Sequence, residues 1–120
     1  MLNLDTHILV AALAGELTVK ERSLISKESL AVSDIVLWEL AKLVQLKRLV
    51  LDMDSVAFRR SLRYLTIIPI TVQIARQSTK LDFASDPADE LIAATSIVER
   101  IPLLTRDRKI LKSRLVPLAK

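Results

Sequence analysis

The sequence predicts an α/β domain in which a mostly parallel central sheet is covered by helices on both faces. Three observations lead to this prediction. Short apolar or β-branched stretches alternate with longer helical patterns along the whole chain. Hydrophobic residues make up 51% of the chain and charged residues 27%, so the chain can bury a core and is not a disordered tail. With 120 residues we expect a single domain over residues 1–120.

The first half of the chain predicts two strands and four helices. The apolar run after Asp5 is helical in pattern, and Gly15 can adopt the left-handed conformation that ends a helix. Asp34 is expected to cap a further helix, and Asp54 or Ser55 the next one. In order, the elements are a strand over Leu2–Leu4, helices over Thr6–Ala14 and Val19–Lys27, a strand over Leu30–Ser33, and helices reaching Lys47 and Tyr64.

The second half continues the alternation. Pro69 lies inside a β-branched stretch and cannot donate to a neighbouring strand, which favours an edge or terminal position for that strand. Asp86 and Pro87 are typical of the cap and first position of a helix. The expected elements are a strand over Thr66–Ile70, a helix over Thr71–Leu81, a helix from Asp86 to Arg100, a strand over Leu103–Thr105, a helix over Asp107–Lys112 and an edge strand over Leu115–Leu118.

Composition excludes several kinds of site. The chain has no Cys, so it has no disulfide, no thiolate zinc site and no Cys nucleophile. Its one glycine, Gly15, rules out the glycine-rich loops that cradle nucleotide phosphates. Its one histidine, His7, leaves no histidine pair for acid and base, and we expect a structural role for it. A bound metal ion would therefore need oxygen ligands.

Charge favours a polyanionic partner. The chain carries 18 Lys and Arg against 14 Asp and Glu, a net charge of +4. Residues 100–120 concentrate the excess, with seven basic residues and one acid. No apolar stretch is long enough for a membrane span and no basic segment opens a secretory signal, so we expect a cytoplasmic protein.

Glu39 is the acid that a structural role explains least well. In its predicted helix the neighbours three and four residues away include Ile35, Val36 and Leu43, all apolar. Lys42 is the one polar neighbour at such a spacing. A carboxylate on an apolar stripe costs free energy unless it is compensated, so either Lys42 reaches it or a cation binds there.

Three further acids occupy informative positions. Asp5 and Asp107 each follow a predicted strand, where ligands of open parallel sheets bind, although each also suits a helix cap. Asp89 lies in the first turn of its helix, where an acid also favours the helix dipole, and on the side that packs inward. If these three meet Glu39, the four carboxylates repel one another until a divalent cation binds.

A cation held by carboxylates and water suits Mg²⁺ or Mn²⁺ and phosphate chemistry. Such an ion commonly shares its coordination with substrate phosphate oxygens. Basic residues around an acidic notch would hold a nucleic-acid backbone while the notch acts on one phosphodiester. The candidates for these backbone contacts are Arg106, Arg108, Lys109 and Lys112.

Four ordered blocks of the sequence resemble a PIN-domain nuclease, and most closely the VapC toxins of type II toxin–antitoxin systems. Each block contains one of the four acids. The blocks run from Leu4 to Val10, from Ser33 to Leu40, from Asp86 to Thr95 and from Leu103 to Asp107.

The resemblance implies a three-layer α/β/α fold, a homodimer and a Mg²⁺- or Mn²⁺-dependent endoribonuclease that cuts structured RNA such as tRNA or rRNA. It implies an inhibitory VapB-like antitoxin as partner. The family's catalytic metal ligands fall on Asp5, Glu39, Asp89 and Asp107, and hydroxyls supporting them fall on Thr6 and Thr105.

The block from Asp86 to Thr95 contains two further acids, Glu90 and Asp86. Glu90 stands where such sequences often carry Arg, which adds negative charge beside Asp89. Asp86 is a possible fifth acid at the metal, although we expect it to cap its helix.

Other functions compete with the nuclease. A catalytically inactive PIN-like module would bind RNA or protein without cutting. The stretch Arg48–Asp54 is similar to the phosphoacceptor strand of a response-regulator receiver, but Asp5 has no acidic neighbour as that family requires. A metal-independent ribonuclease needs an acid and a base near neutrality, which one histidine makes difficult.

Overall fold

The computed structural model describes all residues, 1–120, and confirms an α/β fold built on one parallel sheet. Its strands are β1 (Leu2–Leu4), β2 (Leu30–Ser33), β3 (Leu65–Ile68) and β4 (Leu103–Leu104). They lie in the order β3-β2-β1-β4, and every neighbouring pair is parallel. All four strands therefore end at one edge of the sheet, and β3 is an edge strand as Pro69 predicted.

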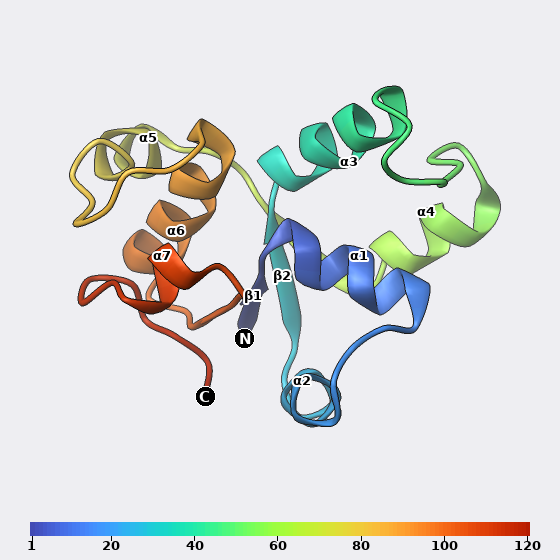
Figure 1. Cartoon of the computed structure of the whole chain (residues 1–120), viewed down its shortest axis with the longest axis horizontal. Helices are drawn as coiled ribbons and strands as arrows, with labels where there is room; N and C mark the ends of the chain where they lie inside the picture. The colour runs from blue at the N-terminus through green and yellow to red at the C-terminus, as the bar shows by residue number, and fades with distance from the viewer.

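Helices cover both faces of the sheet (Figure 1). Two groups lie on opposite sides of the strands, and α3 lies near the end of β2, where it contacts both α1 and α6. One side carries α1 (Thr6–Ala14) and α4 (Val56–Leu62), with α2 (Val19–Ser26) below; the other carries α5 (Val72–Gln77), α6 (Pro87–Glu99) and α7 (Arg108–Leu111); α3 spans Ile35–Gln45.

Side chains at the helix ends explain most of the boundaries. Gly15 takes a left-handed φ of 71° and ends α1. Thr18 and Glu21 form a capping box that starts α2. Ser55 and Thr71 accept backbone N–H groups at the starts of α4 and α5, so Ser55 rather than Asp54 is the cap.

Three helices and one strand end at least two residues earlier than the periodicity predicts. α4 stops at Leu62 instead of Tyr64, and β3 covers Leu65–Ile68 instead of Thr66–Ile70. α3 stops at Gln45 instead of Lys47, because Lys47 adopts a left-handed φ of 59°. α5 stops at Gln77 instead of Leu81, where the hydroxyls of Ser78 and Thr79 donate to the carbonyls three residues before them.

Two local predictions are wrong. Asp34 makes no capping hydrogen bond, and its Oδ2 accepts instead from the backbone N–H of Ile70, 3.3 Å away beyond β3. The predicted strand over Leu115–Leu118 is reduced to a single bridge between Leu103 and Leu118. In both cases the structure depends on a contact with a residue distant in the sequence, and such a contact cannot be predicted from the local sequence pattern.

The core joins the sheet to the helices on both sides. Its fully buried members include Leu4 and Ile92 on β1 and α6. Asn3 on β1 is also fully buried, and its amide donates to the carbonyl of Ile92 at 3.3 Å and to the hydroxyl of Ser96 at 2.9 Å. These contacts fix α6 against β1 and so fix the relative positions of the acids that each carries. No helix has both the length and the apolar character needed to cross a membrane.

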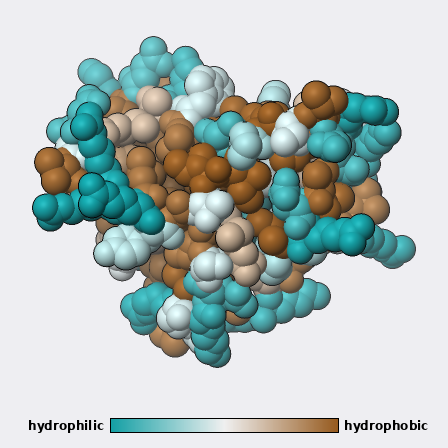
Figure 2. Space-filling view, turned by 180° about the vertical axis from the view of Figure 1, so that it is seen from behind, coloured by the Kyte–Doolittle hydropathy of each residue, from teal (hydrophilic) through white to brown (hydrophobic).

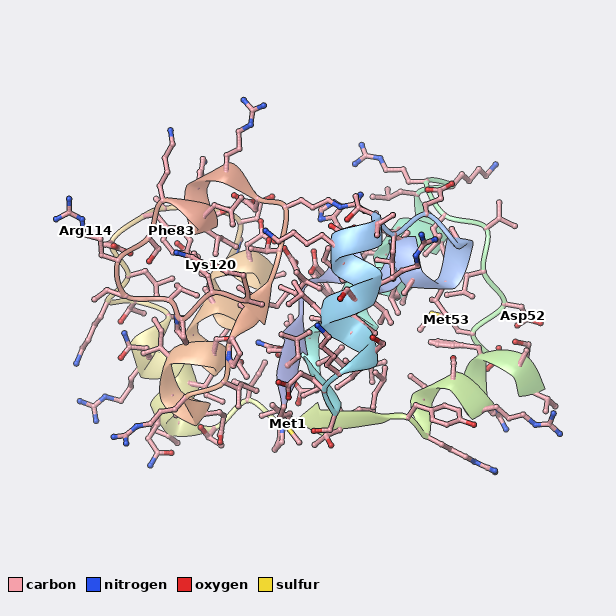
Figure 3. The ribbon with its side chains drawn as sticks, turned by 90° about the horizontal axis from the view of Figure 1, so that it is seen from below. Met1, Asp52, Met53, Phe83, Arg114 and Lys120 are labelled. Atoms are coloured by element: carbon pink, nitrogen blue, oxygen red, sulfur yellow. The ribbon has the colours of Figure 1, made fainter.

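The stretch that resembles a receiver phosphoacceptor strand is not a strand. Residues 48–54 form a loop before α4. Asp52 is exposed, and its carboxylate accepts from the N–H of Asp54 at 3.0 Å. Asp52 and Met53 lie on the opposite side of the molecule from Phe83 and Arg114 (Figure 3). The receiver alternative therefore loses the structural feature on which it depended.

Candidate metal centre

Asp5 and Asp107 lie at the carboxyl ends of the neighbouring strands β1 and β4, joined through one hydroxyl. Asp5 is 2% exposed, and its Oδ1 accepts from the N–H of Thr6 at 2.7 Å. The Thr105 hydroxyl donates to Asp5 Oδ2 at 2.6 Å, and its oxygen accepts from the N–H of Asp107 at 3.0 Å. Asp5 is thus both the cap of α1 and a carboxylate held in a fixed orientation.

Glu39 reaches the same edge from α3. The Thr6 hydroxyl donates to Glu39 Oε1, so Thr6 contacts Asp5 through its backbone and Glu39 through its side chain. Lys42 does not compensate Glu39. Its Nζ donates to Gln45 at 3.1 Å and lies 5.8 Å from the centre of the Trp38 ring. The sequence left two ways to compensate the charge of Glu39, Lys42 or a bound cation. The position of Lys42 rules out the first.

Asp89 comes from the first turn of α6. The hydroxyl of Ser85 donates to Asp89 Oδ2 at 3.0 Å. Asp86 stands at the cap position but its side chain makes no capping hydrogen bond, so the expected cap is wrong in this detail. The Glu90 carboxylate accepts a hydrogen bond from the backbone N–H of Ser85 at 3.3 Å, in the segment before α6.

Burial and mutual repulsion raise the pKa of two of these carboxyls. For Glu39 the largest cause is desolvation; the hydrogen bond from Thr6 opposes it, and the charges of Asp89 and Asp5 raise the pKa further. For Asp89 desolvation again leads, the Ser85 hydrogen bond opposes it, and the charges of Asp5 and Asp107 add to it. The four acids therefore act on one another electrostatically, although they come from four separate segments.

Several carboxylate oxygens of these acids have no partner within the chain. Glu39 Oε2, Asp89 Oδ1 and Asp107 Oδ2 accept no hydrogen bond. The two ion pairs of the chain, Met1 with Glu28 and Arg106 with Glu21, involve none of the four acids.

No three His, Asp or Glu side chains by themselves form a group that could hold a metal ion. A ready-made protein cage is therefore not present. Mg²⁺ usually keeps several waters and takes only one or two carboxylates, so an open site with free carboxylate oxygens agrees with its chemistry.

A polar hollow of about 620 Å³ opens beside Asp89 and Asp107. We call it the acidic hollow; its lining consists of Ala84, Ser85, Asp86, Asp89, Asp107, Arg108 and Lys109. Lys109 Nζ donates to the carbonyl of Ala84 at 3.3 Å across the hollow.

The four basic residues expected at the RNA backbone are placed differently from one another. Arg108 and Lys109 line the acidic hollow together with Asp89 and Asp107. Lys112 lies at the end of α7 and lines no hollow. Arg106 is engaged by Glu21, with Nε and Nη2 donating to the two carboxylate oxygens at 2.8 and 2.7 Å.

Sequence reasoning missed three residues around the site. Ser85 orients Asp89, and Glu21 orients Arg106 across 85 residues of sequence. Neither contact has a local signal, except that Ser85 lies four residues before Asp89. His7 was expected to be structural, but it is exposed and its charge lowers the pKa of Glu39. Its position two residues after Asp5 was the signal available for His7.

The fold is a parallel α/β sheet with acidic side chains from four segments near its carboxyl edge. The PIN domain matches this sequence over residues 3–114, so the chain belongs to the PIN domain family. Proteins of this family are typically nucleases and usually use divalent metal ions. The family resemblance stated from the sequence is therefore confirmed.

Solved structures share the fold over almost the whole chain. A VapBC2 structure from Rickettsia felis, bound to a DNA fragment from its promoter, is 23% identical and has a TM-score of 0.70 over 99% of this chain and 98% of that one. FitAcB from Neisseria gonorrhoeae is 18% identical, with a TM-score of 0.72 over 100% and 97%. DNA-bound VapBC from Salmonella typhimurium is 17% identical, with a TM-score of 0.70 over 98% and 96%. These structural neighbours are VapC and FitB toxins of toxin–antitoxin complexes, and a search of curated sequences finds no match.

Proposed function

We propose that this protein is a Mg²⁺- or Mn²⁺-dependent endoribonuclease, a toxin of the VapC kind. One observation carries the proposal. Four acids come from separate segments near the carboxyl edge of the sheet, the charges of their neighbours in this set raise the pKa of Glu39 and of Asp89, and none of the four forms an ion pair within the chain. A protein does not benefit in stability from such an arrangement, because uncompensated like charges disfavour the folded state.

The residues of the chain have distinct roles in this proposal. Asp5, Glu39, Asp89 and Asp107 would hold the ion. Bound Mg²⁺ or Mn²⁺ would supply a water of lowered pKa and neutralise charge on the phosphate oxygens. The hydroxyls of Thr6 and Thr105, which donate to Glu39 and Asp5, fix the orientation of the carboxylates before the ion arrives. Ser85 does the same for Asp89.

The substrate proposed is RNA, with structured RNA such as tRNA or rRNA as the first candidates. Arg108 and Lys109 at the margin of the acidic hollow would contact the backbone phosphates on either side of the bond that is cut. Attack of water with O3′ as the leaving group gives a 5′-phosphate and a 3′-hydroxyl. Such ends distinguish this reaction from attack by the 2′-hydroxyl, which leaves a 2′,3′-cyclic phosphate.

A VapB-like antitoxin is the proposed protein partner, supported by the fold shared with chains of toxin–antitoxin complexes. An arginine of the antitoxin could pair with the uncompensated carboxylates and keep the ion out. We also propose a homodimer in the cytoplasm. The chain exposes large hydrophobic side chains, among them Tyr64 and Val72, and hydrophobic atoms gather over the middle of the rear face (Figure 2).

The test is cleavage of structured RNA by the purified chain with Mn²⁺ or with EDTA. Wild type should cut only with Mn²⁺ and leave 5′-phosphate ends. Glu39→Gln keeps the shape of the side chain and loses its charge, so cleavage should fall by at least about 100-fold if Glu39 is a ligand. Glu99→Gln, the same change at an exposed residue at the end of α6, is the matched control.

The result also separates the proposal from its main competitor. An RNA-binding PIN-like module without activity would bind the RNA and leave it intact with Mn²⁺. Equal cleavage by wild type and Glu39→Gln would remove Glu39 from the site. Cleavage that survives EDTA would reject the role of the metal.

A further inference from the structure

A second hollow adjoins the first. Its volume is about 270 Å³ and its lining is formed by three polar residues, His7, Arg106 and Asp107. We call it the His7 hollow. Asp107 lines both hollows, so they meet at a residue of the proposed metal centre. The proposed reaction assigns no role to His7, and Arg106 is known so far only as one of the four basic candidates for RNA-backbone contacts.

Arg106 is held rigidly within this hollow by Glu21. The guanidinium donates to both carboxylate oxygens of Glu21 at 2.8 and 2.7 Å, and Nη2 also donates to the carbonyl of Glu16 at 3.3 Å. Glu21 is 8% exposed, and the N–H of Thr18 donates to it at 2.9 Å, so the anchor is itself fixed. The arrangement is a bidentate pair, which sets the plane of the guanidinium.

This pair uses only one edge of the guanidinium. Nη1 of Arg106 has no hydrogen-bond partner, and the side chain remains 46% exposed. His7 is exposed on the first turn of α1 and makes no side-chain hydrogen bond to the protein. Asp107, the acid of the hollow, turns Oδ1 toward the N–H groups of Lys109 and Ile110, which partly offset its charge. The hollow thus presents unused donors from two elements.

We propose that the His7 hollow binds an RNA phosphate next to the one that is hydrolysed, with His7 and Nη1 of Arg106 as its donors and Glu21 as a positioning residue. This inference rests on the proposed function. The RNA backbone would pass over Asp107, with Arg108 and Lys109 holding it on the acidic-hollow side. Backbone phosphates fix register and do not read sequence, so the effect should be the same for RNAs of different sequence.

Two assays on the full chain test this inference. Steady-state cleavage with Mn²⁺ gives kcat and KM, and binding of a fluorescent single-stranded RNA in EDTA gives a metal-free Kd. His7→Ala should raise KM and Kd about five- to tenfold, the loss expected for one hydrogen bond to a phosphate, and leave kcat within about twofold. His7→Gln, which keeps a donor, should recover most of the affinity. Arg59→Ala, at an exposed arginine of α4 outside both hollows, is the control.

Glu21 is tested through Arg106. Glu21→Gln should raise KM about threefold or more at unchanged kcat, because the guanidinium loses one of its two contacts. In an Arg106→Ala background the same change should have no further effect on KM, since a positioning residue has nothing left to position. If Glu21→Gln still raises KM when Arg106 is absent, Glu21 does not act through Arg106, and its assignment as a positioning residue is wrong.

The outcomes separate this inference from the proposed function. If wild type cleaves RNA and His7→Ala has an unchanged KM, the phosphate site is rejected while the nuclease stands. If wild type binds RNA without cutting it and His7→Ala weakens binding, the nuclease is rejected and the phosphate site stands. If Kd is unchanged and kcat falls, His7 belongs to the chemistry and the inference is wrong.

Discussion

The pairing of Glu21 with Arg106 predicts a stability difference that one substitution can measure. Glu21→Gln preserves the capping box, because the amide oxygen can still accept from the N–H of Thr18. It removes the negative charge and one of the two acceptors that the guanidinium uses. The substitution therefore isolates the ion pair that ties the loop after β4 to α2.

The structure sets the size of the expected loss. The pKa of Glu21 is lowered from 4.5 to about 2, chiefly by the hydrogen bond from Arg106, with burial opposing the shift and the hydrogen bonds from Thr18 and the charge of Arg106 adding to it. Taken alone, this difference corresponds to at most about 3.4 kcal/mol. Arg106 is 46% exposed and therefore screened by solvent, and Gln keeps one contact, so we expect a loss of about 1–2 kcal/mol at pH 7.

The assay is urea denaturation of wild type and Glu21→Gln, followed by circular dichroism between pH 7 and pH 3. Because the folded-state pKa is lowered, the stabilisation is complete above 4.5 and is lost as the pH falls toward 2. The difference between the two proteins should shrink by about half between pH 5 and pH 3. Glu99→Gln should show no such difference. A loss below about 0.3 kcal/mol, or one that does not change with pH, would refute the reasoning.

Three further predictions concern the metal centre. Burial raises the pKa of Glu39 and Asp89, so the metal-free protein should lose stability as the pH rises above 4.5. For the same reason, the unfolding free energy of Glu39→Gln should be larger than that of wild type at pH 7, but not at pH 4. Thr105→Val removes the hydroxyl that donates to Asp5 at near-constant side-chain volume. It should lower the unfolding free energy in urea denaturation by about 2 kcal/mol and weaken Mn²⁺ binding in calorimetry by about tenfold or more. Unchanged values would mean that this hydroxyl does not orient Asp5. Mn²⁺ at 100 times its Kd should raise the Tm of wild type by about 10 °C in scanning calorimetry, and an equal rise in Glu39→Gln would contradict its place among the ligands.

Local sequence signals predicted most of the fold. The start of α4 followed from the expectation that Asp54 or Ser55 caps it, and the side chain of Ser55 does so. Gly15 ended α1 because a left-handed φ was needed there. Helix lengths were less predictable. Lys47 takes the same conformation without being glycine, and nothing in the residue type indicates it.

Some residues of the candidate site could be predicted from the sequence, and others could not. Asp5 and Asp107 could be proposed because each directly follows a predicted strand, and parallel strands end at one edge of the sheet. Thr6 and Thr105, which donate to Glu39 and Asp5, were expected from the family resemblance. Ser85 and Glu21 could not be predicted, because they contact Asp89 and Arg106 through the folded geometry and not through a sequence pattern. Lys42 was a reasonable partner for Glu39 by spacing, yet it packs over Trp38 instead.

The most direct test of the metal centre is an anomalous diffraction map from a crystal soaked in Mn²⁺. We predict one peak at the carboxyl edge of the sheet, about 2.0–2.6 Å from oxygens of at least two of Asp5, Glu39, Asp89 and Asp107, with water completing the coordination. The absence of a peak there at saturating Mn²⁺, or a peak elsewhere while these oxygens contact only the protein, would contradict the account.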